Sequence, residues 1–324
     1  MAAETDLLVE HDAHAEHHQP EGGWDGGDKK PFAISYGKLM MWYFLLSDAF
    51  TFSGFLIAYG TLRISSPSWP VPDMVFNTAP FGIHEWFPNE VAPLIFVTFM
   101  SFLLIISSGT MVRAVQEGAR ENKRGVVFWM LLTVVGGAGF LGCQAWEWNN
   151  LISVEHMTVT TNPFGTYVEN GVYLDPETGE PTDEAVIAGE TYLMHKAGES
   201  HGGGHDGEAH FEYPTTATEG PGFMVDDRGY IHRKYLVNDG FDVGTTKTQE
   251  FGPSAFGALF FGITGFHGFH VLTGVGFLLI ILVNAGSGVY AARKNGYEMV
   301  EKIGLYWHFV DLVWVFVFLV FYLL

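Results

Sequence analysis

Two pairs of polar side chains stand inside long apolar runs near the end of the chain. The first pair is His267 and His270, and the second is His308 and Asp311. Each pair has a spacing of three residues, which places its members on one face of a helix. Imidazoles and carboxylates in such a place can ligate a metal, carry a proton or hold neighbouring helices together.

Further polar groups lie in the other apolar runs. Asp48 lies about two turns into the first run, and Gln144 and Glu147 lie on nearly one face at the end of the third. Trp307 and Asp311 belong to one stripe along the last run. Ionisable groups are costly in hydrocarbon, so in a membrane helix they normally face the protein interior and pair there.

Three interpretations of these groups compete. Metal or haem ligation normally takes imidazoles that converge from several helices, and this chain offers a small set. A proton relay needs polar groups across the whole bilayer, so that Asp48 could serve only as a local station. The favoured interpretation is structural pairing, which would join His308 to Asp311, and His267 and His270 to Gln144 or Glu147.

The elements that must position these groups are five apolar runs, each long enough to cross a membrane as a helix. They are expected at about 36–62, 91–115, 126–148, 254–283 and 303–324. The predicted fold is therefore an all-α integral membrane bundle of five transmembrane helices. The chain divides into an acidic, His-rich tail (1–36), helices 1–3 (37–149), a polar insert (150–252) and helices 4–5 (253–324).

The insert, residues 150–252, is expected to lie outside the membrane and to have partly β-hairpin character. Asn170-Gly171 is typical of a hairpin turn, and a second turn is expected at 227–229. His201, His205 and His210 suggest a metal site, but a solvated glycine-rich loop is the favoured interpretation, as it is for the histidines of the tail.

Composition limits the partners of the chain. The net charge is −20, and of the 36 acidic residues eight lie in the first 30 positions and 18 between Glu155 and Glu250. This acidity argues against nucleic acid as a partner. The single cysteine, Cys143, excludes an intrachain disulfide. The N-terminus does not resemble a cleavable signal, so the first helix is expected to drive insertion.

Basic residues predict the orientation, because positively charged loops stay in the cytoplasm. They gather after the second helix (Arg113, Arg120, Lys123, Arg124) and after the fourth (Arg293, Lys294, Lys302), whereas the loop after the first helix has Arg63 alone. The N-terminus is therefore expected inside, and the insert and the C-terminus outside.

Two motifs resemble the signature of the subunit III family of haem–copper cytochrome c oxidases. One is Thr-Gly-Phe-His-Gly-Phe-His-Val at 264–271, and the other is Tyr-Trp-His-Phe-Val-Asp-Leu-Val-Trp at 306–314. Shorter blocks at 44–50, 69–70, 82–83, 91–94, 107–110 and 141–148 are similar to other parts of that family. The resemblance covers all five predicted helices but neither the tail nor the insert.

The resemblance implies a non-catalytic accessory subunit of a proton-pumping aa3/caa3-type cytochrome c oxidase, with O2 as acceptor, in the aerobic respiratory chain of a bacterial inner membrane. Haem and copper would lie in partner subunits, and this chain would pack on subunit I, accompany subunit II and bind phospholipid without a metal of its own. Asp48 would support proton uptake. The other polar residues (Gln144, Glu147, His267, His270, Trp307, His308, Asp311) would be structural or contact lipid.

Three departures from the family pattern keep alternatives open. The chain has five predicted helices where many members have seven, and Asp48 stands where cytochrome c oxidases usually have Glu. Both features are also the pattern of the quinol-oxidase branch, so subunit III of a quinol oxidase is the alternative. The third departure is the length of the insert, which could dock another respiratory complex or a basic cytochrome c, or cover the oxidase's own outer face. A free-standing transporter or scaffold would need broken helices or repeats, which the sequence does not display.

Overall fold

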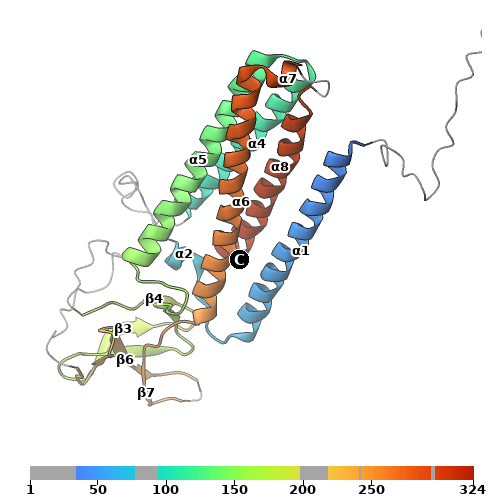
Figure 1. Ribbon diagram of the computed structural model, residues 1–324. Helices are drawn as coiled ribbons and strands as arrows, with labels where there is room; N and C mark the ends of the chain where they lie inside the picture. Colours follow the sequence, from blue (N-terminus) through green and yellow to red (C-terminus); the bar gives the residue numbers. More distant parts are fainter. Residues whose placement is uncertain (1–33, 77–93, 198–217, 241, 293–295) are drawn as a thin grey trace, which may run out of the picture.

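The computed structural model describes residues 34–76, 94–197, 218–240, 242–292 and 296–324. In this part of the chain, long helices form one bundle and a group of strands lies at one of its ends (Figure 1). The tail histidines, His201, His205, His210, Arg293 and Lys294 lie outside the described residues.

Five of the described helices are long and apolar enough to cross a membrane, which confirms the predicted number. They are α1 (Tyr36–Ser65), α4 (Ile95–Ala119), α5 (Lys123–Ser153), α6 (Ser254–Ser287) and α8 (Glu298–Phe318), which continues into the π-helical turn η3 (Leu319–Leu323). Two single-turn helices accompany them, α2 (Pro72–Val75) and α7 (Val289–Ala292). The chain is thus an integral membrane protein, and its helices begin and end within a few residues of the expected bounds.

Helices α4, α5, α6 and α8 pack against one another, and α1 lies at the edge of the bundle against α6 and α8 (Figure 1). The buried residues of α1 are Leu45, Phe52 and Tyr59, spaced seven apart, so that this helix buries one narrow stripe. Close approach inside the bundle depends on small residues. A Cβ atom at Gly137 of α5 would lie 2.5 Å from the Trp307 ring of α8.

The insert contains seven described strands in two sheets. They are β1 (Phe164–Thr166), β2 (Gly171–Leu174), β3 (Pro181–Val186), β4 (Thr191–Leu193), β5 (Phe223–Val225), β6 (Ile231–Val237) and β7 (Thr246–Thr248). Strand β1 pairs with β4, and the larger sheet has the order β3-β2-β6-β5 with β7 also on β6. A separate small core of tyrosines, including Tyr167, Tyr173, Tyr192 and Tyr235, fills the insert.

One of the two expected hairpins is confirmed and the other is wrong. Strands β5 and β6 pair across the turn at Asp226–Gly229, where Gly229 has φ +85°. By contrast, Asn170-Gly171 does not join β1 to β2, because β1 pairs with β4 and β2 with β3 and β6. Gly171 is needed for close packing instead, since a Cβ there would lie 2.4 Å from the Leu236 carbonyl oxygen.

The basic connection between α4 and α5 lies at the end of the bundle opposite the strands, together with α7 (Figure 1). That connection contains Arg120 and leads into Lys123 and Arg124 at the start of α5. The bundle therefore has one basic end and one end that carries the insert.

Candidate functional site

The Asp48 carboxylate of α1 meets the His270 imidazole of α6 inside the bundle. Asp48 Oδ2 lies 3.2 Å from His270 Nε2, and the side chains are 14% and 10% exposed. Asp48 occupies this place because it lies on the same stripe as Leu45 and Phe52, which are buried. We call these two residues the Asp48–His270 pair.

The hydrogen bonds of His270 indicate which of its ring nitrogens faces Asp48. Its Nδ1 lies 2.8 Å from the Phe266 carbonyl oxygen, which can only accept, so Nδ1 carries a hydrogen. Nε2 is then the ring nitrogen that faces the Asp48 carboxyl group, at 3.2 Å. The pair therefore brings together two side chains from different helices that can each accept or release a proton.

Neighbouring groups hold this pair in place. The Tyr306 hydroxyl of α8 donates to the His270 carbonyl oxygen at 2.9 Å and lies 3.2 Å from the Thr273 hydroxyl. The ring of Phe52 lies edge-on to the imidazole, with 5.6 Å between centroids. Three helices thus meet at His270, and the contacts of its ring with Phe52 and Asp48 restrict the rotation of that ring.

A second polar cluster surrounds the fully buried Glu147 of α5. Its Oε2 accepts a hydrogen bond from Gln144 Nε2 and another from the Tyr322 hydroxyl, each at 3.0 Å. Glu147 Oε1 has no hydrogen-bond partner among the described residues. Tyr322 belongs to η3, so this cluster ties the end of the chain to α5.

His267 lies between these two groups but pairs with neither. The residue is fully buried, and neither ring nitrogen has a hydrogen-bond partner within the described part of the chain. Its ring packs against Trp314 and Phe140, at centroid distances of 5.1 and 5.8 Å. The expected pairing of His267 and His270 with Gln144 or Glu147 is therefore wrong, because His270 bonds to α1 and Tyr322 takes the place beside Glu147.

Serine hydroxyls of α4 form hydrogen bonds with polar side chains of α8. The Ser108 hydroxyl lies 2.5 Å from His308 Nδ1, and the Oδ1 atom of Asp311 has no hydrogen-bond partner among the described residues, so His308 bonds to Ser108 rather than to Asp311 as expected. The buried indole N–H groups find acceptors in the same helix: Trp307 donates to Ser107 at 3.1 Å and Trp314 to Ser101 at 2.9 Å.

Sequence reasoning missed these serines and Tyr322. A signal for the serines was available, because a buried indole N–H needs an acceptor and two tryptophans seven residues apart imply two acceptors on the neighbouring helix. Tyr322 carried no comparable signal, since it stands in an apolar run close to the end of the chain.

The arrangement suits proton binding and helix pairing. Among the described residues no group of three or more His, Cys, Asp or Glu side chains is placed to hold a metal ion. Nor does a described hydrogen bond link the Asp48–His270 pair to the Glu147 cluster. Each is therefore a separate polar cluster within the bundle.

Comparisons with known proteins place these groups in a family context. The family model described as cytochrome c oxidase subunit III matches residues 246–324, which include His267, His270, Trp307, His308 and Asp311. The chain is 24% identical to quinol oxidase subunit 3 of Bacillus spizizenii over 73% of this chain and 70% of that protein. It is 23% identical to quinol oxidase subunit 3 of Bacillus subtilis, over 88% of this chain and 86% of that one.

A shorter and closer match is to cytochrome c oxidase subunit 3 of Alkalihalophilus pseudofirmus. The identity is 38% over 23% of this chain, and the match spans about a third (35%) of that protein. The short match at higher identity and the two long matches at lower identity are all to subunit 3 of an oxidase.

Proposed function

The chain belongs to the subunit III family of haem–copper oxidases, and we propose that it is the accessory, non-catalytic subunit of a proton-pumping aa3/caa3-type cytochrome c oxidase. In this proposal it packs on subunit I, accompanies subunit II and binds phospholipid. The haem and copper of the complex are held by those partner subunits, so this chain contributes stability and proton supply rather than electron transfer.

The observation that carries the proposed role is the Asp48–His270 pair. It brings a carboxyl group and an imidazole, two side chains that can exchange protons, to 3.2 Å from each other inside the bundle. Asp48 is the thirteenth residue of α1, about 18 Å along the helix from Tyr36 at 1.5 Å per residue. A proton held there could be passed toward a neighbouring subunit during turnover.

We propose that the basic end of the bundle faces the cytoplasm of a bacterium and that the insert faces the periplasm. The basic connection between α4 and α5 supports this orientation, because lysine and arginine are retained on the cytoplasmic side. Asp48 then lies in the half of α1 that begins on the cytoplasmic side, from which an oxidase takes up protons.

A quinol-fed oxidase is the second candidate, and a specific observation favours it. Both long matches are to quinol oxidase subunit 3, whereas the match to the Alkalihalophilus cytochrome c oxidase subunit covers 23% of this chain. The motifs at 264–271 and 306–314 favour cytochrome c instead.

A reduced-minus-oxidised spectrum of the complex that co-purifies with this chain in mild detergent tests the proposal, with copper measured on the same sample. Bands of haem a together with a dinuclear copper centre would support a cytochrome c oxidase. Bands of haem b or o without that centre would support a quinol oxidase. A preparation that contains neither haem nor copper would contradict both.

A further inference from the structure

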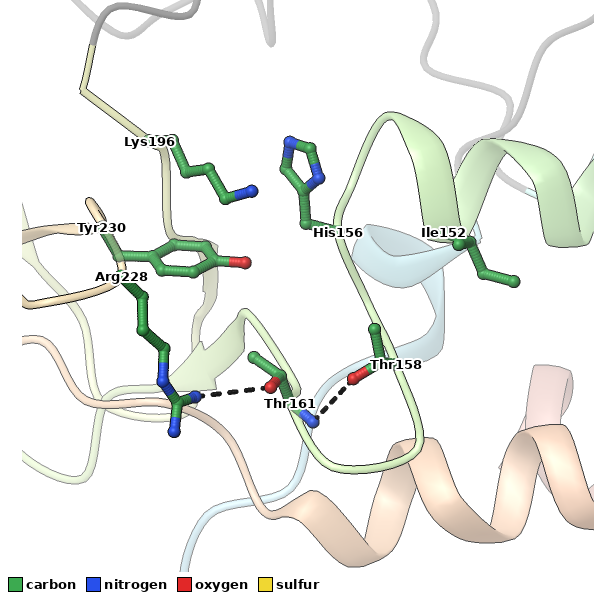
Figure 2. Close-up of a pocket in the computed structure, with 7 residues that line it drawn as sticks. All are labelled: Ile152, His156, Thr158, Thr161, Lys196, Arg228 and Tyr230. Atoms are coloured by element: carbon green, nitrogen blue, oxygen red, sulfur yellow. Dashed lines mark hydrogen bonds between the residues drawn. The ribbon is translucent and has the colours of Figure 1, made fainter.

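A pocket of about 280 Å³ lies where the insert meets the end of α5. It is lined by Ile152, His156, Thr158, Thr161, Lys196, Arg228 and Tyr230. Figure 2 shows the Lys196 ammonium group, the His156 imidazole and the Tyr230 hydroxyl around one space, with the Arg228 guanidinium beside Thr161. None of the described residues that line this pocket carries a carboxylate, although the insert is strongly acidic.

The pocket differs from the rest of the insert in that its lysine and arginine are not in ion pairs with described carboxylates. Three of the insert's five Lys and Arg residues are in ion pairs: Arg233 with Glu184 at 2.5 Å, Lys234 with Glu219 at 3.0 Å, and Lys247 with Glu169 at 2.7 Å. The other two are Lys196 and Arg228, and neither is in an ion pair with a described residue. Both line the same pocket.

The local structure positions these two cations. Lys196 and Tyr230 face each other in an antiparallel bridge, and the Lys196 ammonium lies 5.3 Å from the centre of the Tyr230 ring. Arg228 stands on the turn between β5 and β6 and donates to the Thr161 hydroxyl at 3.4 Å. Thr161 is itself held by a hydrogen bond from its backbone N–H to the Thr158 hydroxyl at 3.0 Å.

This set of donors is the kind that recognises phosphate. A guanidinium, an ammonium and several hydroxyls together match the oxygens of a phosphate group, and bonds to charged donors are the strong ones. His156 contributes from a backbone position of positive φ, +57°, which is uncommon for a residue other than glycine and turns the chain sharply after α5.

The length of α5 leads us to expect the pocket near the level of the membrane headgroups. Helix α5 has 31 residues and is about 46 Å long, whereas the hydrocarbon core of a bilayer is about 30 Å thick. Ile152 is in the last turn of α5 and is 45% exposed at one wall of the pocket. An apolar side chain beside a cationic pocket at this depth is suited to the junction of headgroup and acyl chain.

We propose that this pocket is a phosphate-binding site and that its occupant is the headgroup of an anionic phospholipid. The site lies outside residues 246–324, the segment that the family model matches, and it deepens the proposed function, on which it rests, by assigning phospholipid binding to a particular pocket of the insert. The proposal does not depend on which electron donor the oxidase uses. Binding here would anchor the insert to the membrane surface.

The test uses the full chain in non-ionic detergent, titrated with dihexanoyl phosphatidylglycerol below its micelle concentration and, separately, with inorganic phosphate. The variant is Lys196→Gln/Arg228→Gln. The matched control is Lys234→Gln/Lys247→Gln, which removes the same two charges from the insert but leaves the pocket intact. We expect the pocket variant to lower the affinity for the lipid at least about tenfold, and the control to change it less than about twofold.

Each result supports or overturns the proposal. Tight lipid binding that depends on the pocket supports it, and weaker binding at higher salt is expected with it. Phosphate that binds as tightly as the lipid would support the phosphate site but overturn the lipid as its occupant. An equal loss in the control, or lipid binding that neither variant changes, would overturn the site. Arg228→Gln alone alters an exposed side chain on a turn, and it should give a smaller loss in the same direction without affecting the fold.

Discussion

Asp48 and His270 are 222 residues apart in the sequence, and their side chains meet at 3.2 Å. The contact joins α1, which buries a narrow stripe, to α6, which is packed on several sides. Other polar contacts fix the two ends of α1: Lys38 pairs with Glu301 at 2.7 Å, and Arg63 donates to the Leu324 carbonyl. The edge helix is thus held by polar contacts at three levels.

Replacing Asp48 by Asn should slow proton uptake without preventing assembly. The amide keeps the size of the side chain but cannot accept and release a proton as a carboxyl group does. We expect proton uptake by the reconstituted oxidase to fall by less than about tenfold, or inactivation during turnover to become faster. Lys38→Gln is the control, because it loosens α1 at a partly exposed ion pair and leaves the Asp48–His270 pair unchanged. If Asp48→Asn has the turnover and lifetime of the wild type, Asp48 has no part in proton supply.

The Asp48–His270 pair should show an energetic coupling of its own. A double-mutant cycle with Asp48→Asn and His270→Gln isolates the contact from other effects of each substitution. Hydrogen bonds between membrane helices contribute about 0.6–2 kcal/mol, and we expect a coupling energy in that range. The measurement is the free energy of unfolding of the full chain in mixed micelles. Additive effects would mean that the contact contributes nothing to holding α1.

Tyr322→Phe should destabilise the bundle through Glu147. The substitution removes the hydroxyl that donates to Glu147 Oε2 and keeps the aromatic ring. Because the carboxyl is fully buried and its Oε1 already has no described partner, we expect a loss of about 1–3 kcal/mol of unfolding free energy. Tyr306→Phe serves as comparison, since its hydroxyl bonds to a backbone carbonyl whose helical bond remains. Tyr306→Phe should therefore lower the free energy of unfolding by less than Tyr322→Phe does.

The helices could be predicted because each apolar run exceeds the thickness of a bilayer, which leaves few alternatives for the chain. The start of α6 at Ser254 follows directly from the change from polar to apolar sequence. The strand pairing of the insert could not be predicted in the same way. Asn170-Gly171 is a local signal for a turn. The pairing, however, joins β1 to β4 and β2 to β6, and these partner strands lie far along the chain.

The burial of the ionisable residues could be predicted, but their partners could not. Polar side chains in apolar helices normally face the protein interior, so the types and positions of Asp48, Glu147, His267 and His270 were sufficient to predict that these residues lie there. Their partners depend on how each helix is rotated about its axis, and residue spacing within a helix contains no information on that rotation. Tyr322 is the clearest case, because only the fold brings it to Glu147.

Acid should weaken the turn between β2 and β3. Hydrogen bonds from the backbone and hydroxyl of Thr178, and from the Glu177 backbone, hold the pKa of the Asp175 carboxyl below its usual range. A group with a lowered pKa stabilises the folded state above its unfolded pKa of about 3.9, and this contribution is lost as the pH falls through the folded value. Amide-exchange protection of residues 171–186, referenced to unstructured peptide at each pH, should therefore decline below about pH 4 in the wild type. Asp175→Asn cannot titrate, so equal declines in both proteins would contradict the assignment.

Two glycines of α5 should respond oppositely to alanine. At Gly137 the new Cβ would lie 2.5 Å from the buried Trp307 ring and 2.8 Å from Val275, and the indole cannot withdraw without losing its bond to Ser107. We expect Gly137→Ala to cost about 1–3 kcal/mol. At Gly142 nothing lies within 4 Å of the new Cβ, so the same substitution should stabilise the helix by up to about 1 kcal/mol. Thermal unfolding of both variants in one detergent measures the difference, and a Gly137→Ala variant that is as stable as the wild type would mean that α5 and α8 do not approach as closely as the Trp307 contact requires.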